Sequence, residues 1–263
     1  LLMALQGFYY CECNGNDFII LLKDELFIEL TDSNIQKLCR FEKESTDGLL
    51  LVDTSIDSYD FKMDYYNNDG SWETMCANGA LCIIKLLQSR EFLFSYNLFK
   101  AGDADHQITF NENRFGIKMK TPEFKTEDIN INDIQGAHID SGAKHFVTMI
   151  GTTDHERLYT IAQEIRYDDY FKPDGLNVNF LHINDSNSIR VITYEKGIES
   201  IMKSCGSGSV AAAFYGASKQ KLSSPLQISN PGGDMMIEFN SNWDDVWLYS
   251  SPSIIKESSL ELA

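Results

Sequence analysis

Two similar stretches organise the sequence: MCANGALCIIKLL at residues 75–87 and KSCGSGSVAAAFYGA at residues 203–217. In each stretch a cysteine is followed by small residues and then by a run that is apolar on most faces of a helix. A helix with so little polar surface is buried in the protein interior. The two stretches therefore predict two loops that lead from Cys76 and Cys205 into the N-termini of buried helices.

Strand-like segments precede both stretches in the same order. Residues 19–22 and 49–53 are apolar runs of strand length, and residues 147–150 and 189–195 take the corresponding places in the second half. We therefore predict an α+β fold of two pseudo-symmetric domains, each a sheet wrapped around a central buried helix.

The seam between the two predicted domains lies near residues 120–125. We expect an N-terminal lobe at residues 1–120, which carries Cys76, and a C-terminal lobe at residues 121–253, which carries Cys205. No low-complexity linker separates them.

The composition excludes several classes of function. Lys and Arg number 22 against 39 Asp and Glu, so the net charge is −17, which disfavours binding to nucleic acid or to an anionic membrane. No apolar run approaches the roughly 20 residues that span a bilayer. The first residues lack the basic region of a secretory signal. We expect a soluble, cytoplasmic protein.

The six cysteines are too sparse for a disulfide scaffold and lack the spacing of a zinc site. Most of them are expected to be small buried hydrophobes. Cys76 and Cys205 differ, because a helix N-terminus binds carboxylates and lowers the pKa of a nearby thiol. Taken alone, either loop is better explained as a turn with a packed cysteine. A regulatory disulfide between the two is a further alternative.

Paired loops in matching halves favour a two-thiol active site. One thiolate would remove the α-proton of an amino acid, and the other thiol would deliver a proton to the opposite face. The helix N-termini would hold the α-carboxylate and stabilise the charge that develops as the proton leaves. This chemistry needs no pyridoxal phosphate, and the sequence has no nucleotide-binding fingerprint, so we expect neither a cofactor nor a metal.

An ordered set of motifs resembles the diaminopimelate epimerase family, a group of cofactor-independent enzymes of lysine and cell-wall precursor synthesis. The matching pieces span residues 15–210 and are GNDF (15–18), DGLL (47–50), YNNDGS (66–71), MCANGA (75–80), GAKHFV (142–147), NVNF (177–180), RVITYEKG (190–197) and SCGSG (204–208). No single motif is decisive, but the ordered set is highly specific for this family.

The resemblance implies a role for each matching residue. It makes Cys76 and Cys205 the acid–base pair and places His145 and Glu195 where side chains tune the pKa values of the cysteines. It implies substrate contacts at Asn16, Asn67, Ala77, Asn78, Asn177, Glu195, Lys196, Gly206 and Ser207. It also implies that residues 254–263 return to the first lobe as a last strand, and that a homodimer, common in the family, is the oligomer to test for.

The sequence departs from the family pattern at the end of the site that is remote from the reacting carbon. Ala143 and Lys144 replace an Asn-Pro or small-residue-Pro pair, and Lys196 replaces an arginine that grips the distal carboxylate of the substrate. Residues 201–203 also differ. Lysine meets a carboxylate as a point charge, without the bidentate fork of arginine.

These departures leave alternatives to epimerisation of LL-diaminopimelate to the meso form. The first is a racemase of another amino acid on the same fold. The second is an amino-acid-binding protein without catalytic activity. The third is a redox sensor that uses Cys76 and Cys205.

Overall fold

The computed structural model describes residues 4–41, 45–111, 114–149, 151 and 154–262. Ile150 of the predicted strand 147–150 and Ala263 of the predicted returning segment lie outside the described residues. The chain divides into two compact units, with residues 1–117 and 250–263 in unit 1 and residues 118–249 in unit 2.

Unit 1 is a sheet with two α-helices. Its elements are β1 (Ala4–Cys13), β2 (Asn16–Leu22), the 3-10 helix η1 (Lys23–Glu25), α1 (Asp32–Cys39), β3 (Gly48–Asp53), β4 (Phe61–Asn67), β5 (Trp72–Glu73), α2 (Ala77–Ser89), β6 (Leu98–Lys100), β7 (Asp105–Phe110), β8 (Phe115–Met119), which runs into unit 2, and β19 (Ser253–Leu262).

Unit 2 repeats this arrangement. Its elements are β9 (Glu123–Phe124), β10 (Ile129–Ile131), β11 (Ile134–Asp140), β12 (Lys144–Met149), α3 (His155–Arg166), the 3-10 helix η2 (Asp169–Phe171), β13 (Asn177–Asp185), β14 (Ser188–Glu195), β15 (Ser200–Ile201), α4 (Gly206–Lys219), β16 (Leu226–Asn230), β17 (Gly233–Phe239) and β18 (Val246–Ser250).

The strand pairings of the two units follow the same order. In unit 1, β1–β2 is antiparallel, β2–β3 parallel and β3–β4 antiparallel, and β4 pairs antiparallel with β5 and parallel with β6. In unit 2, β11–β12, β12–β13 and β13–β14 repeat these directions, and β14 pairs antiparallel with β15 and parallel with β16. The two halves therefore share one topology as well as one sequence pattern.

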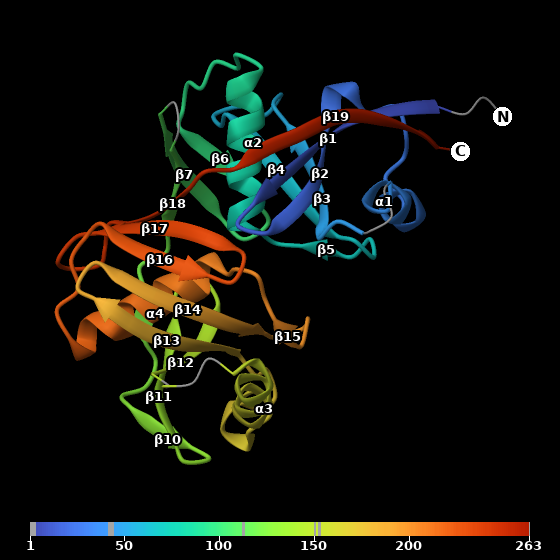
Figure 1. Cartoon of the computed structure of the whole chain (residues 1–263). Helices are drawn as coiled ribbons and strands as arrows, with labels where there is room; N and C mark the ends of the chain where they lie inside the picture. The colour runs from blue at the N-terminus through green and yellow to red at the C-terminus, as the bar shows by residue number, and fades with distance from the viewer. Residues whose placement is uncertain (1–3, 42–44, 112–113, 150, 152–153, 263) are drawn as a thin grey trace. The chain divides into compact units, whose positions relative to one another are not determined.

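Each sheet is covered on both faces, which explains its continuous apolar strands. In unit 1 the face with Ile19, Leu21 and Leu49 packs on α1, whereas Leu50 points to α2. In unit 2 the face with Phe146 and Phe180 packs on α3, and α4 contacts β11 to β14. The cysteine helices α2 and α4 are thus the buried helices of their units (Figure 1).

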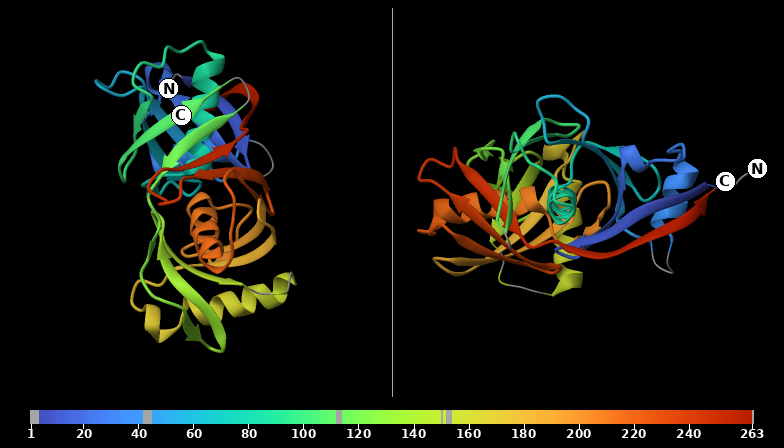
Figure 2. Two further views of the ribbon diagram at one scale, coloured as in Figure 1. Left: turned by 90° about the vertical axis from the view of Figure 1, so that its left-hand side faces the viewer. Right: turned by 90° about the horizontal axis from the view of Figure 1, so that it is seen from above.

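Two further features of unit 1 involve its first strand. Asn14 and Gly15 have positive φ values of 52° and 83° and form the two-residue turn between β1 and β2, the geometry that matches the twist of a hairpin. The last strand, β19, runs antiparallel to β1 along nearly its whole length (Figures 1 and 2).

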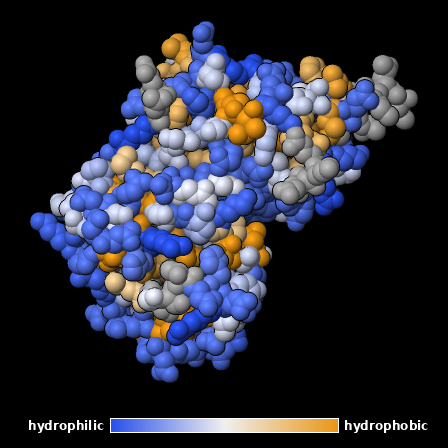
Figure 3. All heavy atoms as spheres, in the orientation of Figure 1, coloured by the Kyte–Doolittle hydropathy of each residue, from blue (hydrophilic) through white to orange (hydrophobic). Residues whose placement is uncertain are grey.

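The face of the molecule in Figure 3 is largely hydrophilic, with apolar residues in separate small groups. Among the helices of the described ranges, none has both the length and the hydrophobicity of a transmembrane segment.

Candidate active site

Cys76 is the N-cap residue of α2. Its backbone is extended, with φ −133° and ψ 118°, and its carbonyl oxygen accepts the first helical hydrogen bond, from the Ala80 N–H at 2.9 Å. Cys76 and Ala77 are half-buried, and Asn78 is buried in the first turn. The first N–H groups of α2 have no partner within the helix, so this end of it can bind a carboxylate.

A network of amides holds the first turn of α2. Asn14 donates to Asn78 Oδ1 at 3.0 Å, and Asn78 donates to Asn16 Oδ1 at 2.8 Å. The Ser250 hydroxyl donates to Asn14 Oδ1, and Asn16 donates to the Asp47 carboxylate, both at 2.9 Å. The three asparagines are at most 8% exposed. The predicted residues Asn16 and Asn78 therefore meet directly, and the hairpin turn is tied to the helix N-terminus.

Cys205 is the N-cap residue of α4, with φ −145° and ψ 117°. Its Sγ accepts a hydrogen bond from the Gly208 N–H at 3.4 Å and lies 3.6 Å from Ser207 Oγ. The Ser141 hydroxyl donates to the Ser207 carbonyl oxygen at 2.7 Å and ties the loop to the end of β11. Gly206 is buried, and Ser207 is half-buried.

The surroundings of Cys205 favour its thiol. Burial raises its pKa to about 11, and the negative charge of Glu195 acts in the same direction. Hydrogen bonds from the backbone N–H groups of Gly208 and Ser207 act against this rise in the pKa. Cys205 therefore carries its proton at neutral pH, and the charge of Glu195, at the end of β14, favours the thiol. A pKa-tuning role of Glu195 in catalysis stays a prediction.

His145 lies at the start of β12 and is fully buried. Its Nδ1 lies 2.8 Å from Asn179 Oδ1, and its Nε2 lies 3.0 Å from Ser207 Oγ. Burial lowers the pKa of His145 to about 4, so the ring is neutral at pH 7. The structure therefore connects His145 to Cys205 through one hydroxyl.

Two other predicted residues of unit 2 meet at the β13 and β14 ends. The Lys196 N–H donates to Asn177 Oδ1 at 2.8 Å. Lys144 forms an ion pair of 2.7 Å with Asp174, and this hydrogen-bonded lysine lowers the pKa of Asp174, with Lys196 adding a smaller effect. Two of the replaced positions of the family pattern, Lys144 and Lys196, thus both act on Asp174 through positive charge.

Asn67 ends β4 in unit 1. Its Nδ2 donates to Ser71 Oγ at 3.0 Å, and its backbone N–H donates to the Ser71 carbonyl at 2.8 Å. These bonds serve the β4–β5 turn, so a substrate contact of Asn67 stays a prediction.

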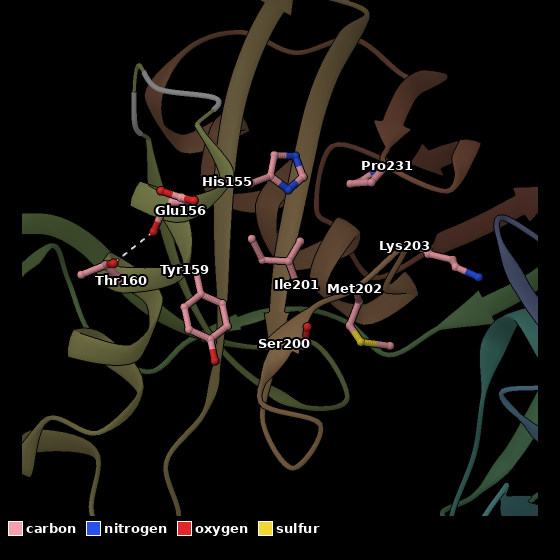
Figure 4. Close-up of a pocket in the computed structure, with 9 residues that line it drawn as sticks. All are labelled: His155, Glu156, Tyr159, Thr160, Ser200, Ile201, Met202, Lys203 and Pro231. Atoms are coloured by element: carbon pink, nitrogen blue, oxygen red, sulfur yellow. Dashed lines mark hydrogen bonds between the residues drawn. The ribbon is translucent and has the colours of Figure 1, made fainter. Parts of the chain in front are cut away.

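A cavity of about 570 Å³ in unit 2 lies between α3 and β15 (Figure 4). Its lining includes the apolar side chains of Ile201 and Met202 and the polar side chains of His155, Glu156 and Lys203. None of the predicted site residues lines it. In the described part of the chain no group of three or more His, Cys, Asp or Glu side chains is arranged to hold a metal ion.

Sequence reasoning missed four residues that support the site: Asn14, Ser141, Asn179 and Thr193. Asn179 donates to Thr193 Oγ1 at 2.7 Å, and both side chains are buried. A signal for Asn179 was present, because it stands two residues after Asn177 and therefore on the same face of the strand. Thr193 could be recognised only from the pairing of β13 with β14, which places it opposite Asn179.

Comparison with solved structures supports the fold. A phenazine biosynthesis protein of the PhzF family from Bacillus anthracis aligns with a TM-score of 0.71 over 99% of this chain and 100% of that chain, at 13% identity. A probable proline racemase from Agrobacterium radiobacter aligns with a TM-score of 0.69 over 98% of this chain and 93% of that chain, at 12% identity. The predicted α+β fold class is confirmed.

Sequence comparison identifies the family. The diaminopimelate epimerase family model matches residues 137–251. Diaminopimelate epimerase of Flavobacterium psychrophilum is 31% identical over 96% of this chain and 99% of its own length. That of Chlorobaculum tepidum is 29% identical over 94% of this chain and 98% of its own length. The resemblance read from the motifs is confirmed, and the chain belongs to the diaminopimelate epimerase family.

Proposed function

We propose that this protein is an isomerase that converts LL-diaminopimelate to meso-diaminopimelate, a step of lysine biosynthesis, with Cys76 and Cys205 as the acid–base pair. The observation that carries the proposal is the cysteine at the N-cap of each buried helix, in a chain whose relatives of nearly equal length are diaminopimelate epimerases. The reaction takes place in the cytoplasm and uses no cofactor.

The chemistry follows from the two helix ends. One thiolate takes the α-proton, so the C–H bond breaks, an S–H bond forms and the electron pair stays on the α-carbon and its carboxylate. The other thiol gives its proton to the opposite face of that carbon, so a new C–H bond forms and a thiolate remains. Backbone N–H groups and the helix dipoles stabilise the negative charge on the carboxylate during the transfer.

The residues around each cysteine have separate tasks in this proposal. In unit 1, Ala77 and Asn78 carry N–H groups for the substrate, and the Asn14–Asn78–Asn16 network keeps them in place. In unit 2, Gly206 and Ser207 supply the corresponding groups, and Asn177 holds the backbone of Lys196. Lys196 binds the distal carboxylate of the substrate by charge.

Proton NMR in deuterated water tests the proposal. The reduced protein is mixed with LL-diaminopimelate, and the α-proton signal should disappear as the meso isomer forms. A panel of other L-amino acids serves as the comparison. Exchange with another amino acid but not with diaminopimelate would identify a racemase of different specificity, and binding without exchange would identify a non-catalytic protein.

A further inference from the structure

The two units place different side chains at equivalent positions beside their cysteine helices. Phe18 pairs with Gly48 in the β2–β3 ladder, and His145 pairs with Asn177 in the equivalent β12–β13 ladder. His145 is therefore the counterpart of Phe18. By the same register, Asn179 is the counterpart of Leu50, and their partners on the next strand are Thr193 and Tyr65.

In unit 1 these positions are apolar or aromatic. Phe18 and Leu50 are at most 1% exposed, and the Phe18 ring lies edge-on to the Tyr65 ring with 6.1 Å between centroids. The Leu50 methyl groups lie about 3.0 Å from where a Cβ on Gly79 would stand. The fold therefore tolerates apolar side chains next to the first turn of a cysteine helix.

In unit 2 the same positions hold three buried polar side chains. His145 and Asn179 are fully buried, and Thr193 is 1% exposed. Burying polar groups costs stability unless each one is hydrogen-bonded, and unit 1 shows that the fold does not need them. His145 contacts Ser207, and Ser207 contacts Cys205. We therefore infer that the three polar side chains act on the Cys205 thiol.

The donors and acceptors fix the direction of the chain. Asn179 uses its Nδ2 to donate to Thr193 Oγ1, so its Oδ1 faces His145 Nδ1 as an acceptor. His145 must then carry its proton on Nδ1, which leaves Nε2 as an acceptor. The Ser207 hydroxyl has one proton and donates it in a hydrogen bond to Nε2 of His145. The Ser207 oxygen therefore faces Cys205 with a lone pair, as an acceptor.

We propose that Asn179, held by Thr193, is a positioning residue that fixes the tautomer of His145 and thereby keeps Cys205 in its thiol form. The inference rests on the proposed function, in which Cys205 is then the acid of the resting enzyme that receives LL-diaminopimelate. When its S–H bond breaks, the proton goes to the substrate carbon and the electron pair stays on sulfur. The Gly208 N–H and a turned Ser207 hydroxyl then donate to the thiolate.

Other charged groups act on the same two side chains. The negative charge of Glu195 on β14 disfavours the thiolate of Cys205. Asp140 and His138 on β11 act on His145 in opposite directions, since the aspartate favours a charged ring and the second histidine disfavours it. Burial has a larger effect on the pKa of His145 than either charge, so the ring stays neutral. The tautomer of the neutral ring then determines whether Nε2 donates to or accepts from Ser207.

Nitrogen-15 NMR of the imidazoles tests the tautomer in the unmodified chain. The five histidines give five pairs of ring signals, and His145 is assigned by its loss in His145→Gln. We expect His145 to be neutral at pH 7 with the proton on Nδ1. A proton on Nε2, or an imidazolium at pH 7, would overturn the proposal without any variant of Asn179 having to fold.

Alkylation of Cys205 tests the consequence. Iodoacetamide is applied across a range of pH, and the Cys205 peptide is quantified by mass spectrometry. Thr193→Val removes the group that holds the amide, and Asn179→Leu installs the side chain that unit 1 uses. Each should accelerate alkylation at pH 7.5 by roughly fivefold or more, because Ser207 can then donate to sulfur. Thr193→Ser keeps the hydroxyl and should leave the rate unchanged.

Unchanged alkylation rates in both folded variants, or slower rates, would overturn the positioning role. Alkylation requires no turnover, so this result is independent of whether the protein epimerises diaminopimelate. Absence of α-proton exchange together with the expected alkylation shifts would instead reject the proposed function and leave the hydrogen-bond chain intact.

Discussion

Cys76 and Cys205 stand at the N-caps of two buried helices with nearly the same backbone conformation, φ −133° and ψ 118° against φ −145° and ψ 117°. Their surroundings differ. Behind the helix that Cys76 caps lie Phe18, Leu50 and Tyr65, whereas Cys205 contacts Ser207 and through it a buried histidine. The same N-cap conformation therefore presents two thiols with different surroundings. This difference suits a reaction that needs both a base and an acid.

Cys76→Ala and Cys205→Ala should each remove catalysis. Loss of a general acid or base lowers the rate of proton transfer by about 10² to 10⁴-fold. Exchange of the α-proton with solvent, followed by NMR, measures this for each variant. Cys39→Ala, a change at the buried last residue of α1, should retain exchange. Full activity in either of the first two variants would reject the two-base mechanism.

Asn78→Ala should destabilise unit 1. The change leaves Asn14 Nδ2 and Asn16 Oδ1 without the partner that each has in the buried network, and an unsatisfied buried polar group costs about 1–3 kcal/mol. Urea unfolding measures the loss. Asn184→Ala, which removes an exposed amide bonded to Ser188, is the matched control and should change stability by less than about 0.5 kcal/mol.

Gly208→Ala should be more damaging than Gly79→Ala. A Cβ on Gly208 would overlap the Asn179 side-chain amide and approach Thr193 Oγ1 to 3.0 Å, whereas a Cβ on Gly79 would meet the movable methyl groups of Leu50. Overpacking of this kind costs about 1–3 kcal/mol. Thermal unfolding of the pair checks the order, and equal melting temperatures would contradict it.

His145 should make the protein sensitive to acid. Its pKa is lowered from 6.5 to about 4 by burial, so between these values the unfolded chain binds a proton that the folded chain does not. The free energy of unfolding therefore falls as the pH drops from about 6.5 to 4, by about 3 kcal/mol from this residue. Urea unfolding at pH 7 and pH 4 should show a smaller decrease in His145→Gln than in the unmodified chain.

Lys196→Arg should improve binding of diaminopimelate. The guanidinium can form a bidentate pair with the distal carboxylate, which is worth about 1 kcal/mol over a point charge, or roughly a fivefold lower KM. Lys125→Arg, an exposed pair partner of Glu123, is the control and should leave KM unchanged. A higher KM of Lys196→Arg for diaminopimelate would contradict this role of Lys196.

The sequence predicted those parts of the fold that depend on local pattern. The helices after Cys76 and Cys205 and the apolar strands follow from hydrophobic periodicity. The ordered motifs also led to the family, because their residue types and their order are visible along the chain without knowledge of its folding.

The hydrogen-bond chains of the site could not be predicted in the same way. Asn78 and Asn14 are 64 residues apart in sequence, and His145 and Ser207 are 62 apart, so their contacts depend on strand register and helix placement. Asn179 and Thr193 resemble ordinary strand residues until the pairing of β13 with β14 puts them opposite each other. The pKa of His145 depends on burial, which these contacts determine.

The pairing of β19 with β1 also governs the order in which the chain can assemble during synthesis. Unit 2 is one continuous segment, so all of its strands are available once residue 249 has been made. Unit 1 is discontinuous, and β1 finds its second neighbour only when the final strand emerges, with Gln6 opposite Leu260. Until then the first strand has an open edge, which is a site for wrong pairing. The unit that is translated first is therefore the last to be completed.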